Sequence, residues 1–267
     1  MSDGTGMNKY KITVIMPALN EELCLEAGVS NVLDGFKKYG VNGELLIVND
    51  GSSDRTAGIA ENLALAHDCI NVLHHQIPEG IGSSFMDAVL CAKGEMVVYI
   101  PGDGENDAAE ILRYLPLMEH VDIVVPFVIN REVRAWHRRV LSATFNKIVS
   151  LTSSLSLHYM NGNVIYRKSI LNEIQLKSSG FFYQAELLLK TIGSGYLYAE
   201  VPYIQLRRIG GSSKSTTLSS LFEVARAYCS TMLELYSLNT KNSKVVSASV
   251  TARRLKEMSQ YVESPQG

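Results

Sequence analysis

The stretch KITVIMPALNEE, residues 11–22, sets the fold that we expect of this chain. Its apolar, β-branched first half, residues 11–17, predicts a strand buried on both faces of a sheet. Pro17 ends this run, because proline has no N–H to donate to a neighbouring strand. A polar turn follows, and residues 21–39 then carry apolar side chains at helical spacing. A buried strand therefore leads through a polar turn into a helix.

The same unit recurs as far as residue 100. Short apolar segments at 44–48, 71–74 and 95–100 predict strands, and helices are expected at 54–68 and 82–93. This alternation is typical of an α/β fold with a mostly parallel sheet and helices on both faces. Such sheets bind ligands at the carboxyl ends of their strands. The polar clusters PALNEE, NDGSSD and GDGEND all fall at those ends, which indicates a site there.

The pattern is less regular beyond residue 120. The elements expected there are a strand at 121–128, an Arg-rich helix over about 131–150, the apolar segment NVIYR, a helix at 182–193, a strand at 196–202 and an amphipathic helix at 218–236. We expect the apolar stripe of the last helix to pack on the core, and docking on a membrane surface is the alternative. The units expected are an N-terminal extension (1–10), one α/β domain (11–215), an amphipathic helix (216–238) and a loose polar tail (239–267).

Composition excludes several classes of protein. The chain has 267 residues, a net charge of −2 and a pI near 6.3, which gives no overall attraction to nucleic acid. Its four cysteines are far apart and include no C-x-x-C pair, which argues against a structural zinc site and a disulfide scaffold. No apolar run is long enough to span a membrane, and the first ten residues do not resemble a signal peptide. We expect a soluble cytoplasmic protein with at most peripheral attachment to the cytoplasmic face of a membrane, for which an integral partner is one means.

The stretch YIPGDGENDAAEI, residues 99–111, places carboxylates directly after a buried strand. Asp103 and Glu105 lie two residues apart and are able to present oxygens toward one point. Oxygen ligands of this kind suit Mg²⁺ or Mn²⁺, which share their coordination with the phosphates of a substrate. The alternative is an acidic turn, since Asp, Gly and Asn favour turns. Asp107 is expected to cap a helix that starts at Ala108.

The turn NDGSSD, residues 49–54, is also open to two interpretations. Asp50 is able to accept hydrogen bonds from a nucleobase or ribose, and Gly51 allows close approach of the backbone. The alternative is a capped turn, which we favour for Ser52, Ser53 and Asp54.

Two clusters of basic residues stand out in a chain of negative net charge. Arg131, Arg134 and Arg138 fall on one helical face, and RRIGGSSK, residues 207–214, surrounds two glycines with basic side chains. Guanidinium groups suit bidentate binding of phosphate, and a solvated face is the alternative for either cluster. His74 and His75 are expected to be surface residues at a strand end rather than metal ligands.

Taken in order, eight segments resemble the inverting family 2 glycosyltransferases of the GT-A fold. The nearest resemblance is to the polyprenyl-phosphate branch that includes dolichol-phosphate mannose synthase. The segments are VIMPALNEE, LLIVNDGSSD, YIPGDGEND, REVRAWHRRVLSATFN, MNGNVIYR, FFYQAE, AEVP and RRIGGSSK, and they cover about residues 11–215. The resemblance implies a GT-A domain that uses Mg²⁺ or Mn²⁺ to move a sugar from GDP-mannose or a UDP-sugar onto a polyprenyl or dolichyl phosphate.

The resemblance also implies roles for individual residues. The nucleotide-sugar pocket would be lined by Pro17, Ala18, Asn20, Glu22, Asp50, Gly80 and Asp103, and the metal would be held by Asp103 and Glu105. The catalytic groups would be Asp103, Arg131, Arg139 and Arg208. The acceptor and its phosphate would be bound by Arg134, Ser142, Gln184, Glu186, Ser213 and Lys214.

The chain departs from the family pattern at several of these segments. Pro101 replaces the first carboxylate of the D-x-D motif, and Glu105 stands where glutamine is common. Asn49 replaces the usual aspartate before Asp50, and His158 stands where an aspartate is frequent. These departures leave the donor open. Two alternatives remain: transfer to a sugar hydroxyl, with Glu186 or Asp107 as base, and binding of a nucleotide sugar without transfer.

Overall fold

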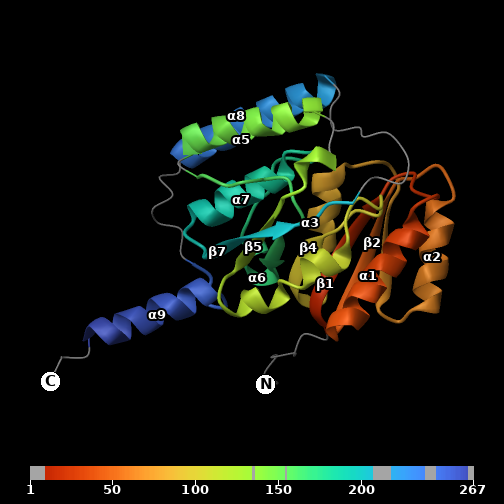
Figure 1. The fold of residues 1–267 in the computed structure, drawn as a ribbon, viewed down its shortest axis with the longest axis horizontal. Coiled ribbons are helices and arrows are strands. Elements are labelled where there is room, and N and C mark those ends of the chain that lie inside the picture. Colours follow the sequence, from red (N-terminus) through yellow and green to blue (C-terminus); the bar gives the residue numbers. More distant parts are fainter. Residues whose placement is uncertain (1–9, 134–135, 154, 207–217, 238–244, 264–267) are drawn as a thin grey trace.

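The computed structural model describes residues 10–133, 136–153, 155–206, 218–237 and 245–263. They form a seven-stranded sheet of order β3-β2-β1-β4-β6-β5-β7 (Figure 1). The first four strands in this order run parallel, β6 runs antiparallel to both β4 and β5, and β7 is parallel to β5. The strands are β1 (Tyr10–Ala18), β2 (Gly43–Asp50), β3 (Ile70–His75), β4 (Gly94–Tyr99), β5 (Ile123–Val128), β6 (Ile165–Arg167) and β7 (Tyr198–Tyr203). The α/β fold class expected from the sequence is confirmed.

Helices cover both faces of this sheet. They are α1 (Leu25–Tyr39), α2 (Thr56–Ala66), α3 (Ile81–Cys91), α4 (Ala108–Leu112), α5 (Trp136–Ser153), α6 (Lys168–Leu171), α7 (Tyr183–Gly193), α8 (Leu218–Ser237) and α9 (Val250–Glu263), with 3₁₀ turns η1 (Leu115–Glu119) and η2 (Arg131–Val133). The apolar side chains of α1, α2 and α4 pack in one buried cluster, and those of α3, α6 and α7 pack in another. β1 contributes to both, with Met16 in the first cluster and Ile15 in the second, because successive strand residues point to opposite faces.

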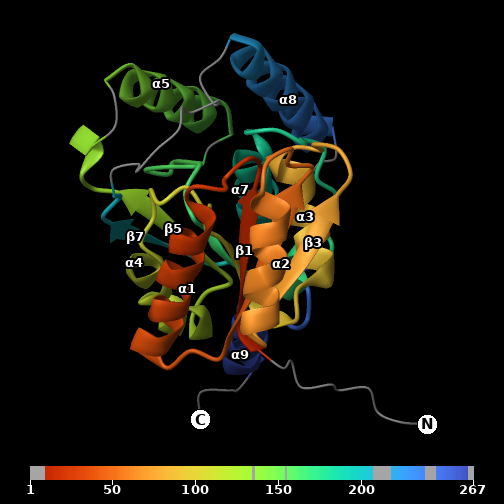
Figure 2. The same cartoon turned by 90° about the vertical axis from the view of Figure 1, so that its right-hand side faces the viewer.

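The order of the strands places a switch point beside β1. The chain leaves β1 toward β2 and β3 on one side, and β4 lies on the other side. A crevice forms outside the carboxyl ends of the strands at such a point and is the usual ligand site of this architecture. Pro17, Ala18 and the loop after Tyr99 lie at this point. In both views α5 and α8 lie together at one end of the molecule, away from α9 (Figures 1 and 2).

The helix expected over about 131–150 is divided. The described part consists of the short η2 turn and then α5, which runs on to Ser153.

The expected helix cap at Asp107 is confirmed, because Asp107 Oδ1 accepts a 2.8 Å hydrogen bond from Ala109 N at the start of α4.

The amphipathic helix α8 packs on the core with part of its apolar stripe. Met232 is buried in the second cluster, and Tyr228 and Leu235 pack against it. Phe222, from the same stripe, remains 73% exposed. The core therefore covers only one section of the stripe. None of the helices among the described residues has the length and apolarity needed to cross a bilayer.

The tail beyond residue 239, expected to be loose, contains the helix α9. Asp122, which is fully buried, accepts hydrogen bonds from the backbone of Val250 and Thr251 at 2.7 and 2.9 Å. It also accepts from Thr251 Oγ1 and from Arg167 Nε. A carboxylate at a helix N-terminus satisfies amides that have no partner within the helix. The residue directly before β5 therefore fixes the beginning of the C-terminal helix.

Candidate active site

The turns that follow β1 and β2 are joined by side chains predicted to line the nucleotide pocket. Asn20 has a left-handed backbone (φ 58°), and its Oδ1 accepts a 2.9 Å hydrogen bond from Ser53 N. Its own N–H donates to Ser52 Oγ at 3.0 Å. Glu22 Oε2 accepts from the backbone and side chain of Arg55 at 3.2 and 3.0 Å. Asn20 and Glu22 therefore hold two strand-end turns against each other at the switch point.

Asp50, the last residue of β2, organises the loop between β3 and α3. Its Oδ1 pairs with His75 Nδ1 at 2.9 Å and accepts from Glu79 N at 2.8 Å, and its Oδ2 accepts from Gly80 N at 3.0 Å. Burial alone would raise the pKa of Asp50, but the hydrogen bonds from Glu79, His75 and Gly80 outweigh it and lower the pKa below its usual value. Asp50 is therefore ionised at neutral pH and held in place.

Two glycines allow that loop to lie close to its neighbours. Gly51 has φ 68°, and a Cβ there would lie 2.6 Å from the carbonyl carbon of Ile77. Gly80 has φ 96°, and a Cβ there would lie 2.7 Å from Ser179 O. Any larger residue at either position would meet backbone atoms in a conformation that L side chains rarely adopt. The loop over residues 76–80 thus rests directly on the turn after β2.

Asp103 and Glu105 lie on the loop after β4, and both are partly exposed. Asp103 Oδ1 accepts a 3.0 Å hydrogen bond from Glu105 N, which sets the turn between them. Glu105 Oε2 accepts a 2.9 Å hydrogen bond from Gln205 Nε2. Gln205 in turn exchanges backbone hydrogen bonds with the side chain of Asn130, at 2.8 and 2.9 Å. The carboxylate loop is therefore fixed to the segment that directly precedes Arg131.

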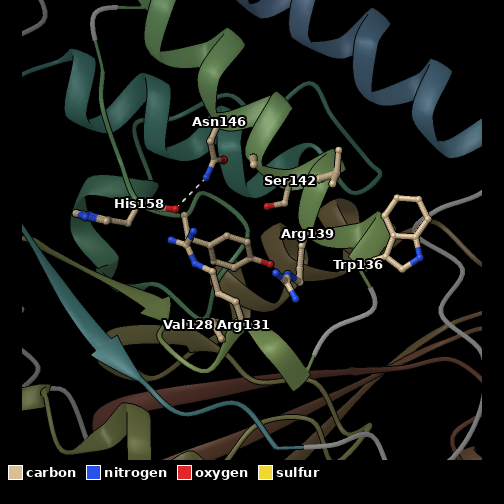
Figure 3. A pocket seen from close by; sticks show the side chains of 10 residues that line it. Val128, Arg131, Trp136, Arg139, Ser142, Asn146 and His158 are labelled. Carbon is tan, nitrogen blue, oxygen red and sulfur yellow. Dashed lines mark hydrogen bonds between the residues drawn. The ribbon is translucent and has the colours of Figure 1, made fainter.

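A cavity of about 330 Å³ opens between α5 and the end of β5. Arg131, Arg139 and Ser142, three of the residues predicted to bind phosphates, all line it. Figure 3 shows these side chains converging on its middle, with Trp136 at one edge and His158 at the other. Two guanidinium groups and a hydroxyl in one space form a site suited to an anionic oxygen ligand.

Gln184 and Glu186, predicted to contact the acceptor, are buried on α7 and do not line this cavity. Glu186 accepts hydrogen bonds from the backbone of Lys177 and Ser178, at 3.0 and 2.9 Å, and pairs with Lys190 Nζ at 2.8 Å. Gln184 Nε2 donates to the buried Tyr166 hydroxyl. In this structure Glu186 supports the loop before α7, and Gln184 ties α7 to β6.

Sequence reasoning missed several residues that shape the site. Gln205 and Asn130 belong to no recognised motif, and only their contacts show that they link the carboxylate loop to the cavity. His158 Nδ1 pairs with Glu200 Oε2 at 3.0 Å, and its ring stacks on Phe127 with the centroids 4.7 Å apart. The expectation that His75 is a surface residue is wrong, because its side chain is only 7% exposed.

Four of the predicted site residues, Arg134, Arg208, Ser213 and Lys214, lie outside the described residues, as does the loop RRIGGSSK that holds three of them.

Comparison with known proteins places these features in a family context. The glycosyl transferase family 2 profile matches residues 13–175. A polyprenol monophosphomannose synthase from Mycolicibacterium smegmatis is 30% identical over 228 residues, which cover 79% of this chain and 84% of that protein. A dodecaprenyl-phosphate galacturonate synthase from Rhizobium johnstonii is 26% identical over 179 residues, which cover 64% of this chain and 52% of that protein.

Solved structures of glucosyl-3-phosphoglycerate synthase from Mycobacterium tuberculosis share the fold. The complex with Mn²⁺, uridine diphosphate and glucosyl-3-phosphoglycerate has a TM-score of 0.59 and 21% identity, and the match covers 85% of this chain and 80% of that one. The complex with phosphoglyceric acid has a TM-score of 0.63 and 20% identity, with the same coverage. At this identity the likeness shows the GT-A fold alone.

Proposed function

The chain belongs to glycosyl transferase family 2, and we propose that it transfers a sugar from a nucleotide diphosphate sugar to a polyprenyl phosphate. The observation that carries this proposal is the convergence of Arg131, Arg139 and Ser142 on one cavity next to the anchored carboxylate loop. The two sequence relatives, named as a polyprenol monophosphomannose synthase and a dodecaprenyl-phosphate galacturonate synthase, support the acceptor class.

The residues after β4 fit a divalent metal ion. Asp103 and Glu105 offer hard carboxylate oxygens on a fixed turn, and Mg²⁺ and Mn²⁺ prefer such ligands. We propose that these two residues hold the ion, with Glu105 supplying the charge that Pro101 does not. When bound, the ion supplies positive charge against the diphosphate that leaves the sugar. Complexes of the structural neighbour contain Mn²⁺ or Mg²⁺, which supports this choice of metal.

The donor is proposed to lie at the switch point, across the turns joined by Asn20 and Glu22. Asp50 is the proposed contact of the nucleobase, and Pro17 and Ala18 line the same edge of the sheet. GDP-mannose and the UDP-sugars are the candidate donors, since one sequence relative is named as a mannose synthase and the structural neighbour contains UDP.

The acceptor phosphate is proposed to bind Arg131, Arg139 and Ser142. A phosphate monoester is already anionic at neutral pH, so its oxygen attacks the sugar without a strong base, and the arginines bind and orient it. The two carboxylates considered as bases for a hydroxyl acceptor are engaged otherwise. Asp107 caps α4 at 2.8 Å, and Glu186 is buried against two backbone amides and Lys190. This favours a phosphate over a hydroxyl acceptor.

A transfer assay with defined donors tests the proposal. The purified protein is incubated with GDP-mannose, UDP-glucose or UDP-galacturonate, Mn²⁺, and either a polyprenyl phosphate or the corresponding polyprenol. Release of nucleoside diphosphate with the phosphate, and none with the alcohol, is the expected result. Thermal shifts with the same donors identify which one binds, because a ligand of the native state raises the midpoint. If donors bind but no acceptor releases diphosphate, the protein only binds nucleotide sugars.

We also propose a peripheral contact with the membrane through α5 and α8. Trp136 and Leu151 on α5 are 74% and 77% exposed, and Phe222 and Leu233 on α8 are 73% and 72% exposed. Both helices lie at the same end of the molecule (Figures 1 and 2). Exposed aromatic and aliphatic side chains on such helices suit the interface between headgroups and acyl chains, where a polyprenyl tail resides. The units 216–238 and 239–267 are proposed to be attachments to a GT-A domain of residues 11–215.

A further inference from the structure

A second group of metal-ligating side chains lies apart from Asp103 and Glu105, beside the loop between β3 and α3. His75, Glu79 and Asp87 each present one ligand atom, and these three atoms all lie within 4.8 Å of one another. His75 ends β3, Glu79 lies on the loop, and Asp87 is on α3. Side chains from three consecutive segments thus face one point.

The hydrogen bonds of His75 fix which ring nitrogen faces this point. Its Nδ1 lies 2.9 Å from Asp50 Oδ1. A carboxylate oxygen accepts hydrogen bonds, so Nδ1 is the donor in this contact. Nε2 is left to face Asp87 Oδ2, 3.5 Å away. A carboxylate that holds one nitrogen of a histidine while the other binds a metal is a recurrent arrangement at zinc sites.

The carboxylates around Nε2 favour a bound cation. The lone pair of an unprotonated Nε2 would face Asp87 Oδ2 at 3.5 Å, Glu79 belongs to the same group of ligand atoms, and Asp50 holds the far side of the ring. Such a contact is repulsive without positive charge between the atoms. A bound metal ion would supply that charge. The ring itself is buried, with 7% of its side chain exposed.

We propose that His75 Nε2, Glu79 and Asp87 bind a Zn²⁺ ion, with water as the fourth ligand. One imidazole and two carboxylates suit zinc better than Mg²⁺, which prefers oxygen ligands alone. A tetrahedral zinc ion with bonds of about 2.0–2.2 Å sets its ligand atoms about 3.3 Å apart. The separation of His75 and Asp87 is already near this value. Glu79 is exposed on its loop, so its side chain is able to close the remaining distance by rotation.

The ion would fasten the loop that rests on the nucleotide-binding turn. Residues 76–80 pack on Gly51, and Asp50 holds both the ring of His75 and the backbone of Glu79. A metal bond from Glu79 to His75 and Asp87 would tie the loop to both β3 and α3. Zinc is therefore expected to slow hydrogen exchange of the amides in 76–80, without any need for turnover. This role is separate from the proposed transferase activity and does not depend on it.

Direct zinc titration of the full chain tests the site. Isothermal titration with Zn²⁺ is carried out in excess Mg²⁺, which occupies oxygen-only sites. One Zn²⁺ per chain is expected, and Glu79→Gln, Asp87→Asn and His75→Gln should each weaken binding by at least about tenfold. Co²⁺ in place of Zn²⁺ should give the intense visible absorption of a tetrahedral site in the wild type and lose it in these variants.

Two control variants separate this site from its neighbours. His74→Gln alters the adjacent histidine, which is bound to Glu61 and Asn49 instead, and should leave zinc affinity unchanged. Asp103→Asn alters the other proposed metal site and should also leave it unchanged. The proposal is overturned if no zinc binds. It is equally overturned if Glu79→Gln and Asp87→Asn bind zinc like the wild type, or if Asp103→Asn abolishes binding.

Discussion

Gln205 Nε2 donates a 2.9 Å hydrogen bond to Glu105 Oε2, and the two residues are 100 positions apart in the chain. The backbone of Gln205 is held at the same time by the side chain of Asn130. The carboxylates proposed to hold the metal and the arginines proposed to hold the acceptor thus share one support. Donor and acceptor are therefore expected to be held in a fixed relation, which is what in-line transfer between them requires.

Asp103→Asn should lower the rate of sugar transfer on the order of 10²-fold, because it removes a charged oxygen from the proposed metal site. Release of nucleoside diphosphate at saturating donor measures the effect. Excess Mn²⁺ should restore part of the activity. The control is Asp34→Asn, which changes an exposed aspartate of α1 and should leave the rate unchanged. A rate for Asp103→Asn within about twofold of the wild type, as is usual for uninvolved residues, would remove this residue from the mechanism.

Arg139→Lys should raise the KM for the polyprenyl phosphate by about tenfold, with a smaller effect on the KM for the donor. Lysine keeps the charge but loses the planar fork that binds two oxygens at once. Initial rates at varied acceptor concentration provide the measurement, and Arg254→Lys on α9 is the matched control. An increase confined to the KM for the donor would mean that the cavity beside α5 binds the diphosphate instead.

Glu186→Gln should lower the free energy of unfolding by about 3 kcal/mol. The side-chain NH₂ of the new glutamine would face one of the two backbone N–H groups that the carboxylate now accepts from, and Lys190 would lose a buried counter-ion. Urea denaturation measures this change. Glu257→Gln, at an exposed position of α9, should change stability by less than about 0.5 kcal/mol. If Glu186→Gln is as stable as the wild type and has a raised KM for the acceptor, its carboxylate contacts substrate, as the sequence resemblance implies.

Stability in acid should depend on Asp50. Its folded-state pKa lies below the value of 3.8 that the unfolded chain has, so the folded protein binds fewer protons there than the unfolded one. Its contribution to stability is complete above pH 3.8 and is lost as the pH falls through the lowered pKa. Asp50→Asn should therefore be less stable than the wild type at neutral pH, and the difference should shrink below pH 3.8. Denaturation curves across this range measure it, and a difference that is independent of pH would contradict the assignment.

Trp136→Ala and Phe222→Ala should each reduce co-sedimentation with liposomes that contain polyprenyl phosphate. Each removes a large exposed aromatic side chain from the proposed membrane contact. The double variant should reduce co-sedimentation by several-fold. Tyr261→Ala on α9, where the side chain is 82% exposed, is the control and should sediment like the wild type. Equal sedimentation of all variants would show that α5 and α8 do not face the lipid.

The positions of the strands along the chain could be predicted because their sequence signals are local. The apolar run that ends at Pro17 is recognised from its own residues alone. The turns after β2 and β4 are likewise recognised from their own polar residues. The family resemblance then assigned Arg131, Arg139 and Ser142, which the structure brings to one cavity.

The parts that sequence reasoning missed depend on distant contacts. The first turn of α9 is capped by Asp122, which precedes Val250 by 128 residues, and no residue near α9 in the sequence predicts this cap. His75 is buried and pairs with Asp50 on the neighbouring strand, and two adjacent histidines at a strand end do not predict such a contact. Spacing placed Glu186 on a helix correctly, but the direction of its side chain depends on the amides of the preceding loop.

The cap that Asp122 places on α9 has a practical consequence for shortened versions of the chain. A protein cut before Val250 would lose both backbone donors and the hydroxyl of Thr251, and a fully buried carboxylate would be left with Arg167 alone. Such a truncation would act on the inner strand β5 rather than on a dispensable end. Shortened versions made for expression and crystallisation should therefore keep α9 and carry any affinity tag beyond it.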